Sequence, residues 1–153
     1  MKITDILPEA LVMPAVKGKT KEEVLRELAA AMAAQHPDID ANRLEEVLWE
    51  RERLGSTAIG DGIAIPHGKL PGLKTVVGAF GRHLQGVDFQ SLDGKPTKLL
   101  FLLVAPEDSV GQHLKALARV SRLLKDPAFR HQLMSAADQS ELYRCIRQED
   151  DKY

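Results

Sequence analysis

The sequence contains almost no cysteine, has few aromatic residues, and neither sign of charge predominates. Cys145 is the only cysteine among 153 residues, which excludes an internal disulfide and a cysteine-rich zinc site. The 21 basic and 22 acidic residues give a formal net charge of -1, and no basic run is present. We therefore expect no nucleic-acid binding, since that function needs a concentrated basic surface.

Long apolar segments are also absent. Residues 1–8 lack the apolar centre of a secretion signal, and the long apolar run at residues 99–105 is far shorter than a membrane span. We therefore expect a cytoplasmic protein that is not embedded in a membrane. A chain of this length buries roughly two thirds of its unfolded surface, so we expect one domain over residues 1–153.

Before residue 60 the apolar residues recur with the period of helices. Thr20 is expected to cap a first helix, with Glu23 as its capping-box partner. Asp40 is expected to cap a second helix, which Gly55 closes. The inward face of this second helix is predicted to comprise three residues at helical spacing, Leu44, Val47 and Leu48.

Between residues 60 and 105 the spacing becomes that of strands. Strands are predicted at 62–67, 75–81 and 99–105, with shorter ones at 87–90 and 11–16. The run at 99–105 is apolar throughout, which is typical of a strand buried on both faces.

After Pro106 the helical period returns. One helix is predicted to turn a single apolar face to the core, formed by Val110, Leu114, Leu117, Ala118, Ser121 and Leu124. Asp126-Pro127 and Asp138 are predicted to start two more helices. Helices placed before and after a block of strands indicate a single layered α/β domain.

One charged residue falls on the inward stripe of the second helix. Arg51 lies seven residues after Leu44, so its side chain must reach past the edge of the core or meet an anion. Pairing with a core-edge carboxylate and a functional role are both open on this argument. Arg53 points to the opposite side and is expected to be a solvated surface charge.

The stretch from Gly55 to Gly62 almost has the glycine spacing of a phosphate-binding loop. Asp61 stands where such a loop needs lysine, and a strand rather than a helix is predicted to follow. We interpret these glycines as turn and close-approach positions, with no nucleotide site.

The five histidines are too widely spread in the sequence for a local metal-ligand pattern, so no metal site is expected. We expect His36, His83 and His131 to lie on the surface. His113 falls in the first turns of the helix after the buried strand. His67 ends a short apolar strand, where Pro66 fixes the backbone and Gly68 is expected to ease the turn that follows. For both, structural hydrogen bonding and catalysis stay open.

Residues 51–69, RERLGSTAIGDGIAIPHGK, decide between these alternatives. This string resembles the phosphoryl-acceptor signature of the fructose/mannitol-type IIA proteins of the bacterial phosphotransferase system, and most of all their nitrogen-regulatory branch. The similarity extends from Ile3 through residues 108–119 to the terminal helices. It implies a mixed central β-sheet flanked by helices on both faces.

The resemblance also implies a chemistry. His67 matches the histidine that accepts a phosphoryl group from the phosphohistidine of a small HPr-like or NPr-like carrier protein. Arg51 and His113 match two supporting positions, and fixed donors there suit a transition state that spreads charge over phosphoryl oxygens. The chain would then be a phosphotransferase component with a phosphohistidine intermediate, needing no metal, nucleotide or other cofactor. Gln112, just before His113, is a departure from the resemblance, because relatives often have an acidic residue at this position.

Two functions fit this resemblance. In the regulatory one, the phosphorylation state controls binding to target proteins, and residues 55–60 favour it because they resemble the regulatory branch. In the alternative, a sugar-transport IIA protein passes the phosphoryl group to a IIB domain. A purely structural binding module would leave Arg51 and His67 unexplained. The identity of the targets, onward transfer and a homodimeric state stay open.

Overall fold

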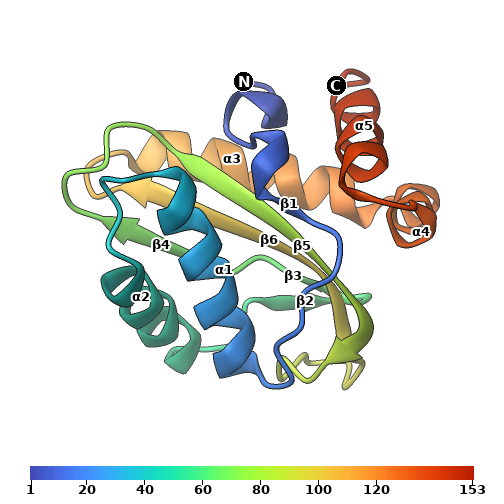
Figure 1. Cartoon of the computed structure of the whole chain (residues 1–153), viewed down its shortest axis with the longest axis horizontal. Coiled ribbons are helices and arrows are strands. Elements are labelled where there is room, and N and C mark those ends of the chain that lie inside the picture. Colours follow the sequence, from blue (N-terminus) through green and yellow to red (C-terminus); the bar gives the residue numbers. More distant parts are fainter.

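A mixed six-stranded sheet forms the centre of the computed structural model, which describes all 153 residues (Figure 1). The strands are β1 Val12–Met13, β2 Ala58–Gly60, β3 Ile63–Ala64, β4 His67–Leu70, β5 Val77–Val87 and β6 Thr97–Pro106. The helices are α1 Lys21–Gln35, α2 Ala41–Arg53, α3 Val110–Lys125, α4 Pro127–Ser135 and α5 Gln139–Asp150, and two 3-10 turns, η1 Ile3–Asp5 and η2 Glu9–Leu11, precede them.

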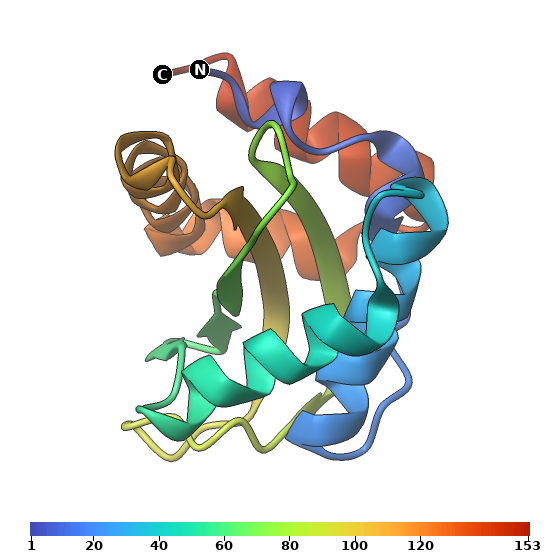
Figure 2. The ribbon, with the colours of Figure 1, turned by 90° about the vertical axis from the view of Figure 1, so that its left-hand side faces the viewer.

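The sheet has the strand order β1-β5-β6-β3-β2, and β4 pairs with β6 beyond the end of β3. β5 and β6 are antiparallel, whereas β3 and β4 both run parallel to β6. Helices α1 and α2 cover one face, and α3, α4 and α5 cover the other (Figure 2). The expected layered α/β fold, a mixed sheet between helices, is therefore confirmed.

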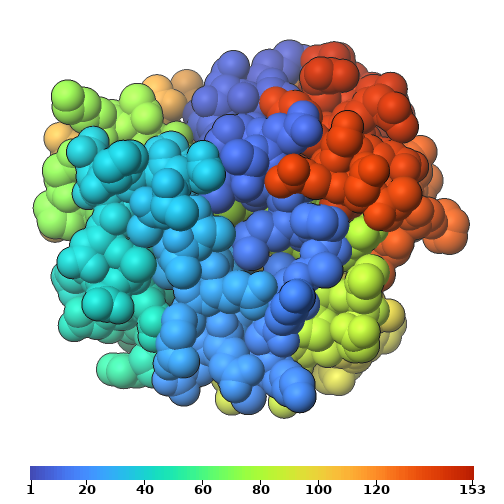
Figure 3. All heavy atoms as spheres, in the orientation of Figure 1, coloured from blue at the N-terminus to red at the C-terminus, as the bar shows by residue number.

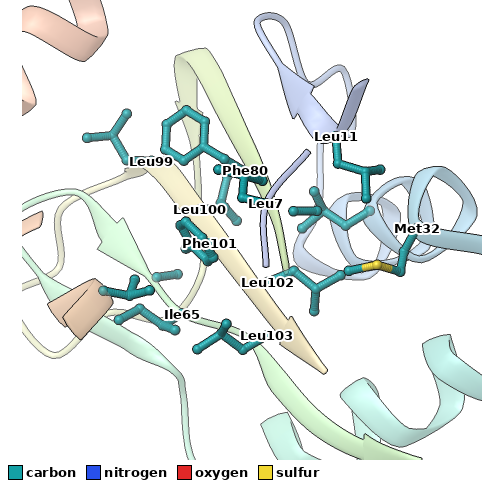
Figure 4. Close-up of a cluster of buried hydrophobic side chains, with 14 of the residues drawn as sticks. Leu7, Leu11, Met32, Ile65, Phe80, Leu99, Leu100, Phe101, Leu102 and Leu103 are labelled. Atoms are coloured by element: carbon teal, nitrogen blue, oxygen red, sulfur yellow. The ribbon is translucent and has the colours of Figure 1, made fainter. Parts of the chain in front are cut away.

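The core is one continuous cluster built on both faces of β6. On one face Phe101 packs edge to face against Phe80 of β5, with ring centroids 6.4 Å apart. Leu102, the next residue, lies on the opposite side of the strand toward Met32 of α1 (Figure 4). The prediction that residues 99–105 are buried on both faces is thus correct.

The two ends of the chain lie side by side on the surface (Figure 3). The fully buried carboxylate of Asp150 accepts a hydrogen bond from the Thr4 backbone N–H at 3.2 Å and pairs with the guanidinium of Arg119 at 2.7 Å. This network fastens η1 and the end of α5 to α3. None of the helices is both long and apolar enough to cross a membrane.

Most predicted helix starts are confirmed by their caps. The Thr20 hydroxyl accepts from the Glu23 N–H at 3.1 Å, and the Asp40 carboxylate accepts from Asn42 N–H at 2.9 Å. The capping box at Thr20 is wrong in one detail. The Glu23 carboxylate accepts from the N–H of Lys19 rather than from that of Thr20.

Two strand predictions are wrong. The strand predicted at 62–67 is interrupted after Ala64, because Pro66 cannot donate a ladder hydrogen bond, and His67 therefore begins β4 instead of ending a strand. The separate strand predicted at 87–90 does not exist. β5 continues to Val87 through an irregularity that contains Gly86 at φ 87°.

The predicted inward face of α3 is wrong except at Leu124, which is buried, and at Leu117, which is partly buried against the core. The buried residues of this helix are His113, Ala116, Val120, Leu123 and Leu124. Val110 and Leu114 are more than half exposed, because α3 carries two neighbouring apolar stripes and the sequence pattern does not say which one meets the sheet.

His83 is not a surface residue as expected. It is buried, its ring Nε2 lies 2.8 Å from the Gly18 carbonyl, and its Nδ1 accepts from the Gly86 N–H. Its two ring nitrogens are thereby satisfied within the protein.

Candidate functional site

The three residues singled out from the sequence line one open cleft of about 540 Å³. Its lining residues come mainly from α2, β4 and α3, and Figure 1 shows where these three elements lie in the fold. β4 supplies His67, the last turn of α2 supplies Arg51, and the first turn of α3 supplies His113. The fold thus brings together side chains that are up to 62 positions apart in the sequence.

The orientation of His67 is set by the break in the chain just before it. Its ring Nδ1 lies 2.8 Å from the carbonyl oxygen of Ile65. A carbonyl can only accept a hydrogen bond, so Nδ1 carries the hydrogen and donates it. The neutral ring therefore has its lone pair on Nε2, the nitrogen a nucleophile would use.

The surroundings of His67 keep this ring neutral. Burial lowers the pKa of His67 below its ordinary value of 6.5, and the nearby positive charge of Arg51 lowers it further. The hydrogen bond to Ile65 and the negative charge of Glu52 act in the opposite direction without cancelling the effect of burial. A neutral imidazole is the form that can attack phosphorus.

His113 faces His67 from the other wall of the cleft. The two imidazole rings meet edge to face, with centroids 5.4 Å apart and an interplanar angle of 82°. Burial, followed by the nearby charges of His67 and Lys69, lowers the pKa of His113 to about 4. Its Nε2 is buried and has no hydrogen-bond partner in the protein.

An unpartnered buried nitrogen costs on the order of 1 to 3 kcal/mol. At His113 this cost is offset whenever an oxygen enters the cleft and accepts from Nε2. The arrangement is therefore suited to an anion held between the two rings.

Arg51 lies half-buried where α2 ends. Its Nη1 donates to the Gly55 carbonyl at 2.9 Å, which uses one of the five N–H donors of a guanidinium. No carboxylate lies within 4 Å of it, so the structure does not contain the carboxylate pairing that the sequence left open. Arg53 is exposed as expected and lies over the Trp49 ring, 6.0 Å from its centroid.

Gly68 brings β4 close to α2. A Cβ atom at this position would lie 2.7 Å from Cγ1 of Val47, well inside van der Waals contact. The expectation that Gly68 eases a turn is therefore wrong, because the residue lies within β4 and serves as a close-approach position. Gly62 does occupy a turn, with φ of 79°, and Gly60 ends β2 just before it, with φ of 94°.

The sequence reasoning missed several groups of the cleft. Lys69 lies on β4 two residues after His67, on the same side of the strand. The rim also carries exposed apolar side chains, Leu54 just after the end of α2 and Val110 and Leu114 of α3. Glu52 was also missed, although its spacing of 44, 48 and 52 continues the buried stripe of α2. That spacing was the signal that could have identified it.

No three histidine, cysteine, aspartate or glutamate side chains lie close enough together to hold a metal ion. The polar groups that line the cleft are instead mainly imidazole, guanidinium and ammonium groups, and the one carboxylate among them, that of Glu50, lies 4.0 Å from the guanidinium of Arg43. Such donors suit a phosphate-like anion.

Comparison with known proteins agrees with this chemistry. Residues 5–149 match the family model described as "Phosphoenolpyruvate-dependent sugar phosphotransferase system, EIIA 2". A nitrogen regulatory protein of Bradyrhizobium diazoefficiens is 46% identical over 146 residues, which cover 95% of each chain. The crystal structure of the nitrogen regulatory protein IIA-Ntr from Neisseria meningitidis superposes with a TM-score of 0.88 at 32% identity, covering 94% of this chain and 98% of that one.

A transport protein also matches. The fructose-specific EIIABC component of Bacillus subtilis is 37% identical over 150 residues, which cover 98% of this chain and 24% of that longer protein.

Proposed function

Because the chain belongs to the EIIA 2 family of the phosphoenolpyruvate-dependent sugar phosphotransferase system, we propose that His67 is its phosphoryl acceptor. The observation that carries this proposal is the hydrogen bond from Nδ1 of His67 to the Ile65 carbonyl, which leaves Nε2 free to attack. We assign residues 1–153 to one domain of this type.

In the proposed step, Nε2 of His67 attacks the phosphorus of a phosphohistidine on a small HPr-like or NPr-like carrier. The new N–P bond forms as the donor's N–P bond breaks, and the electron pair of the broken bond returns to the donor's ring nitrogen. The Ile65 carbonyl stabilises the partial positive charge that develops on the His67 ring, because it accepts from Nδ1. The reaction thus balances without water or a further reactant.

Arg51 and His113 have supporting roles in this proposal. The charge of a metaphosphate-like transition state is spread over three oxygens, which fixed donors can stabilise. The free N–H groups of Arg51 and the unpartnered Nε2 of His113 supply such donors from opposite walls of the cleft. Both act on the transferring group rather than as acceptors.

The rim of the cleft suits a protein donor. The exposed side chains of Val110 and Leu114 form an apolar patch beside His67, and the basic side chains of Arg43 and Lys69 lie on the same rim. An apolar patch with a polar border is typical of a protein-binding surface. We assign this surface to the carrier and, in turn, to the target proteins.

The regulatory function is the one we favour. It rests on the similarity to nitrogen regulatory proteins, which extends over 95% of both chains in the Bradyrhizobium diazoefficiens relative. The similarity to a fructose-specific component supports the alternative, in which the phosphoryl group passes to a IIB domain.

Phosphorylation with enzyme I, the small carrier and phosphoenolpyruvate tests the acceptor. We expect the protein to gain one acid-labile phosphoryl group, and His67→Ala to gain none. Intact-mass spectra showing equal labelling of His67→Ala would refute the assignment.

Arg51→Ala should slow the transfer by about 10²- to 10³-fold while the fold is retained, since it removes a donor to the transition state. Arg53→Ala is the matched control, because it removes an exposed arginine from the same helical turn. Equal slowing by both variants would exclude a specific role for Arg51.

The two functions are separated by what happens after phosphorylation. A phosphoryl group adds about two negative charges at the rim of the cleft. Regulation therefore predicts a target protein that binds the phosphorylated and unphosphorylated forms with different affinity. Rapid transfer to a sugar-specific IIB domain, with equal binding of both forms to every other protein, would instead establish transport.

A further inference from the structure

A buried ion pair lies beneath the cleft and takes no part in the chemistry described so far. The ammonium of Lys21, at the start of α1, lies 2.7 Å from Oε1 of Glu52, in the last turn of α2. Both side chains are almost completely buried, at 8% and 1% exposure. Burying two charges is unfavourable unless hydrogen bonds satisfy them, so their other partners show what the pair holds in place.

Glu52 holds the loop that follows α2. Its carboxylate accepts hydrogen bonds from both the backbone N–H, at 3.1 Å, and the side-chain hydroxyl of Thr57. Lys21 in turn lies 4.9 Å from the ring centroid of Phe89 and 3.4 Å from its carbonyl oxygen. The pair therefore anchors Thr57 to the ends of two helices.

Thr57 leads directly to His67. The Thr57 carbonyl accepts from the backbone N–H of Ile65 at 3.0 Å, and the Ile65 carbonyl accepts from Nδ1 of His67 at 2.8 Å. An unbroken series of contacts thus runs from Glu52 through Thr57 and Ile65 to the ring of His67. Glu52 is also the neighbour of Arg51 in the last turn of α2.

We infer that Glu52, held by Lys21, is a positioning residue that sets the ring orientation and tautomer of His67 for phosphoryl transfer. Without it, Thr57 and then the Ile65 carbonyl would lose their fixed place. The Nδ1–H tautomer would lose its preference over the Nε2–H tautomer, which cannot attack through Nε2. The inference rests on the proposed role of His67, but the tautomer can be measured without any phosphoryl transfer.

The first measurement is the tautomer of His67, from ¹H–¹⁵N correlation spectra of the imidazole in the unphosphorylated protein. The wild type should show Nδ1–H with Nε2 unprotonated. In Glu52→Gln and in Thr57→Val we expect a mixture of the two tautomers of His67. The rate of phosphoryl transfer should fall by about 10- to 100-fold, because the reacting nitrogen is no longer held in place. Thr57→Ser retains the hydroxyl and should restore both properties.

A buried ion pair outside this series supplies the control. Asp150→Asn disrupts the pair with Arg119 and should lower the melting temperature without changing the His67 spectrum. If Glu52→Gln does the same, with an unchanged tautomer and an unchanged rate per folded molecule, its role is structural and the inference is wrong.

If Glu52→Gln does not fold, the two variants Thr57→Val and Thr57→Ser test the inference in its place. Equal tautomers and equal rates for Thr57→Val and Thr57→Ser would overturn the inference. A wild type with the expected tautomer that accepts no phosphoryl group would instead refute the proposed function alone.

Discussion

The rings of His67 and His113 meet edge to face with their centroids 5.4 Å apart, and the pKa of each ring lies below its ordinary value. Burial is the main reason for both lowered pKa values, and the charge of His67 contributes to the low pKa of His113. The two rings are therefore arranged to receive a negatively charged group, and the free protein supplies no such group.

Phosphorylation should raise the pKa of His113 well above its value of about 4 in the free protein. A dianionic group on the neighbouring ring favours the charged imidazolium by Coulomb attraction. We expect NMR titration of His113 to show an upward shift of its pKa in the phosphorylated protein. An unchanged His113 titration would mean that this ring does not face the phosphoryl group.

The same low pKa makes stability depend on pH. The unfolded chain binds a proton at His113 near pH 6.5, whereas the folded protein binds it only near pH 4. His113 therefore contributes stability that is lost as the pH falls between these values, by up to about 3 kcal/mol.

The variant His113→Gln removes this titration. Urea unfolding at pH 7 and at pH 4.5 should show a smaller loss of stability on acidification than in the wild type. His131→Gln, on the exposed surface of α4, should retain the wild-type loss. Parallel pH curves for wild type and His113→Gln would contradict the assignment.

The exposed apolar stripe of α3 should act in docking. Leu114, on the rim of the cleft, is 61% exposed, so Leu114→Glu should alter stability by less than about 0.5 kcal/mol. It should raise the KM for the phosphorylated carrier by roughly tenfold, the effect of losing one apolar contact of about 1.4 kcal/mol. Leu92→Glu, in the loop between β5 and β6, is the control, and an equal effect of both would exclude local docking.

The sequence predicted the layered fold, because helical caps and apolar periodicity are local signals, and it singled out three residues that line one cleft. Thr20, Asp40 and Asp126 each cap a helix through bonds to residues two or three positions away. The Pro-His-Gly element likewise falls within a few residues, so a resemblance could identify it.

Contacts between distant elements could not be predicted in the same way. Which apolar stripe of α3 is buried depends on its packing against β6, and this packing buries His113 and leaves Val110 and Leu114 exposed at the cleft. The partner of Glu52 is Lys21, which is 31 positions earlier in the sequence. Burial of a charged pair leaves no pattern along the chain that would distinguish it from two surface charges.

Gly68 offers a test of how closely β4 and α2 must approach. In Gly68→Ala the new Cβ would lie 2.7 Å from Cγ1 of Val47, so either α2 or β4 must move. Overpacking of this kind costs about 1 to 3 kcal/mol of stability, and a displaced α2 would carry Arg51 away from His67. We therefore expect Gly68→Ala to be less stable and to accept the phosphoryl group more slowly.

The second substitution Val47→Ala removes the clashing methyl group and separates this steric cause from others. In the double variant Gly68→Ala/Val47→Ala the transfer rate should return close to that of Val47→Ala alone, as measured by quench-flow with the phosphorylated carrier. The two changes would then be strongly coupled, as contacting residues are in a double-mutant cycle. Additive effects on the rate would show that the distance between β4 and α2 does not control transfer, and that Gly68 acts through its backbone alone.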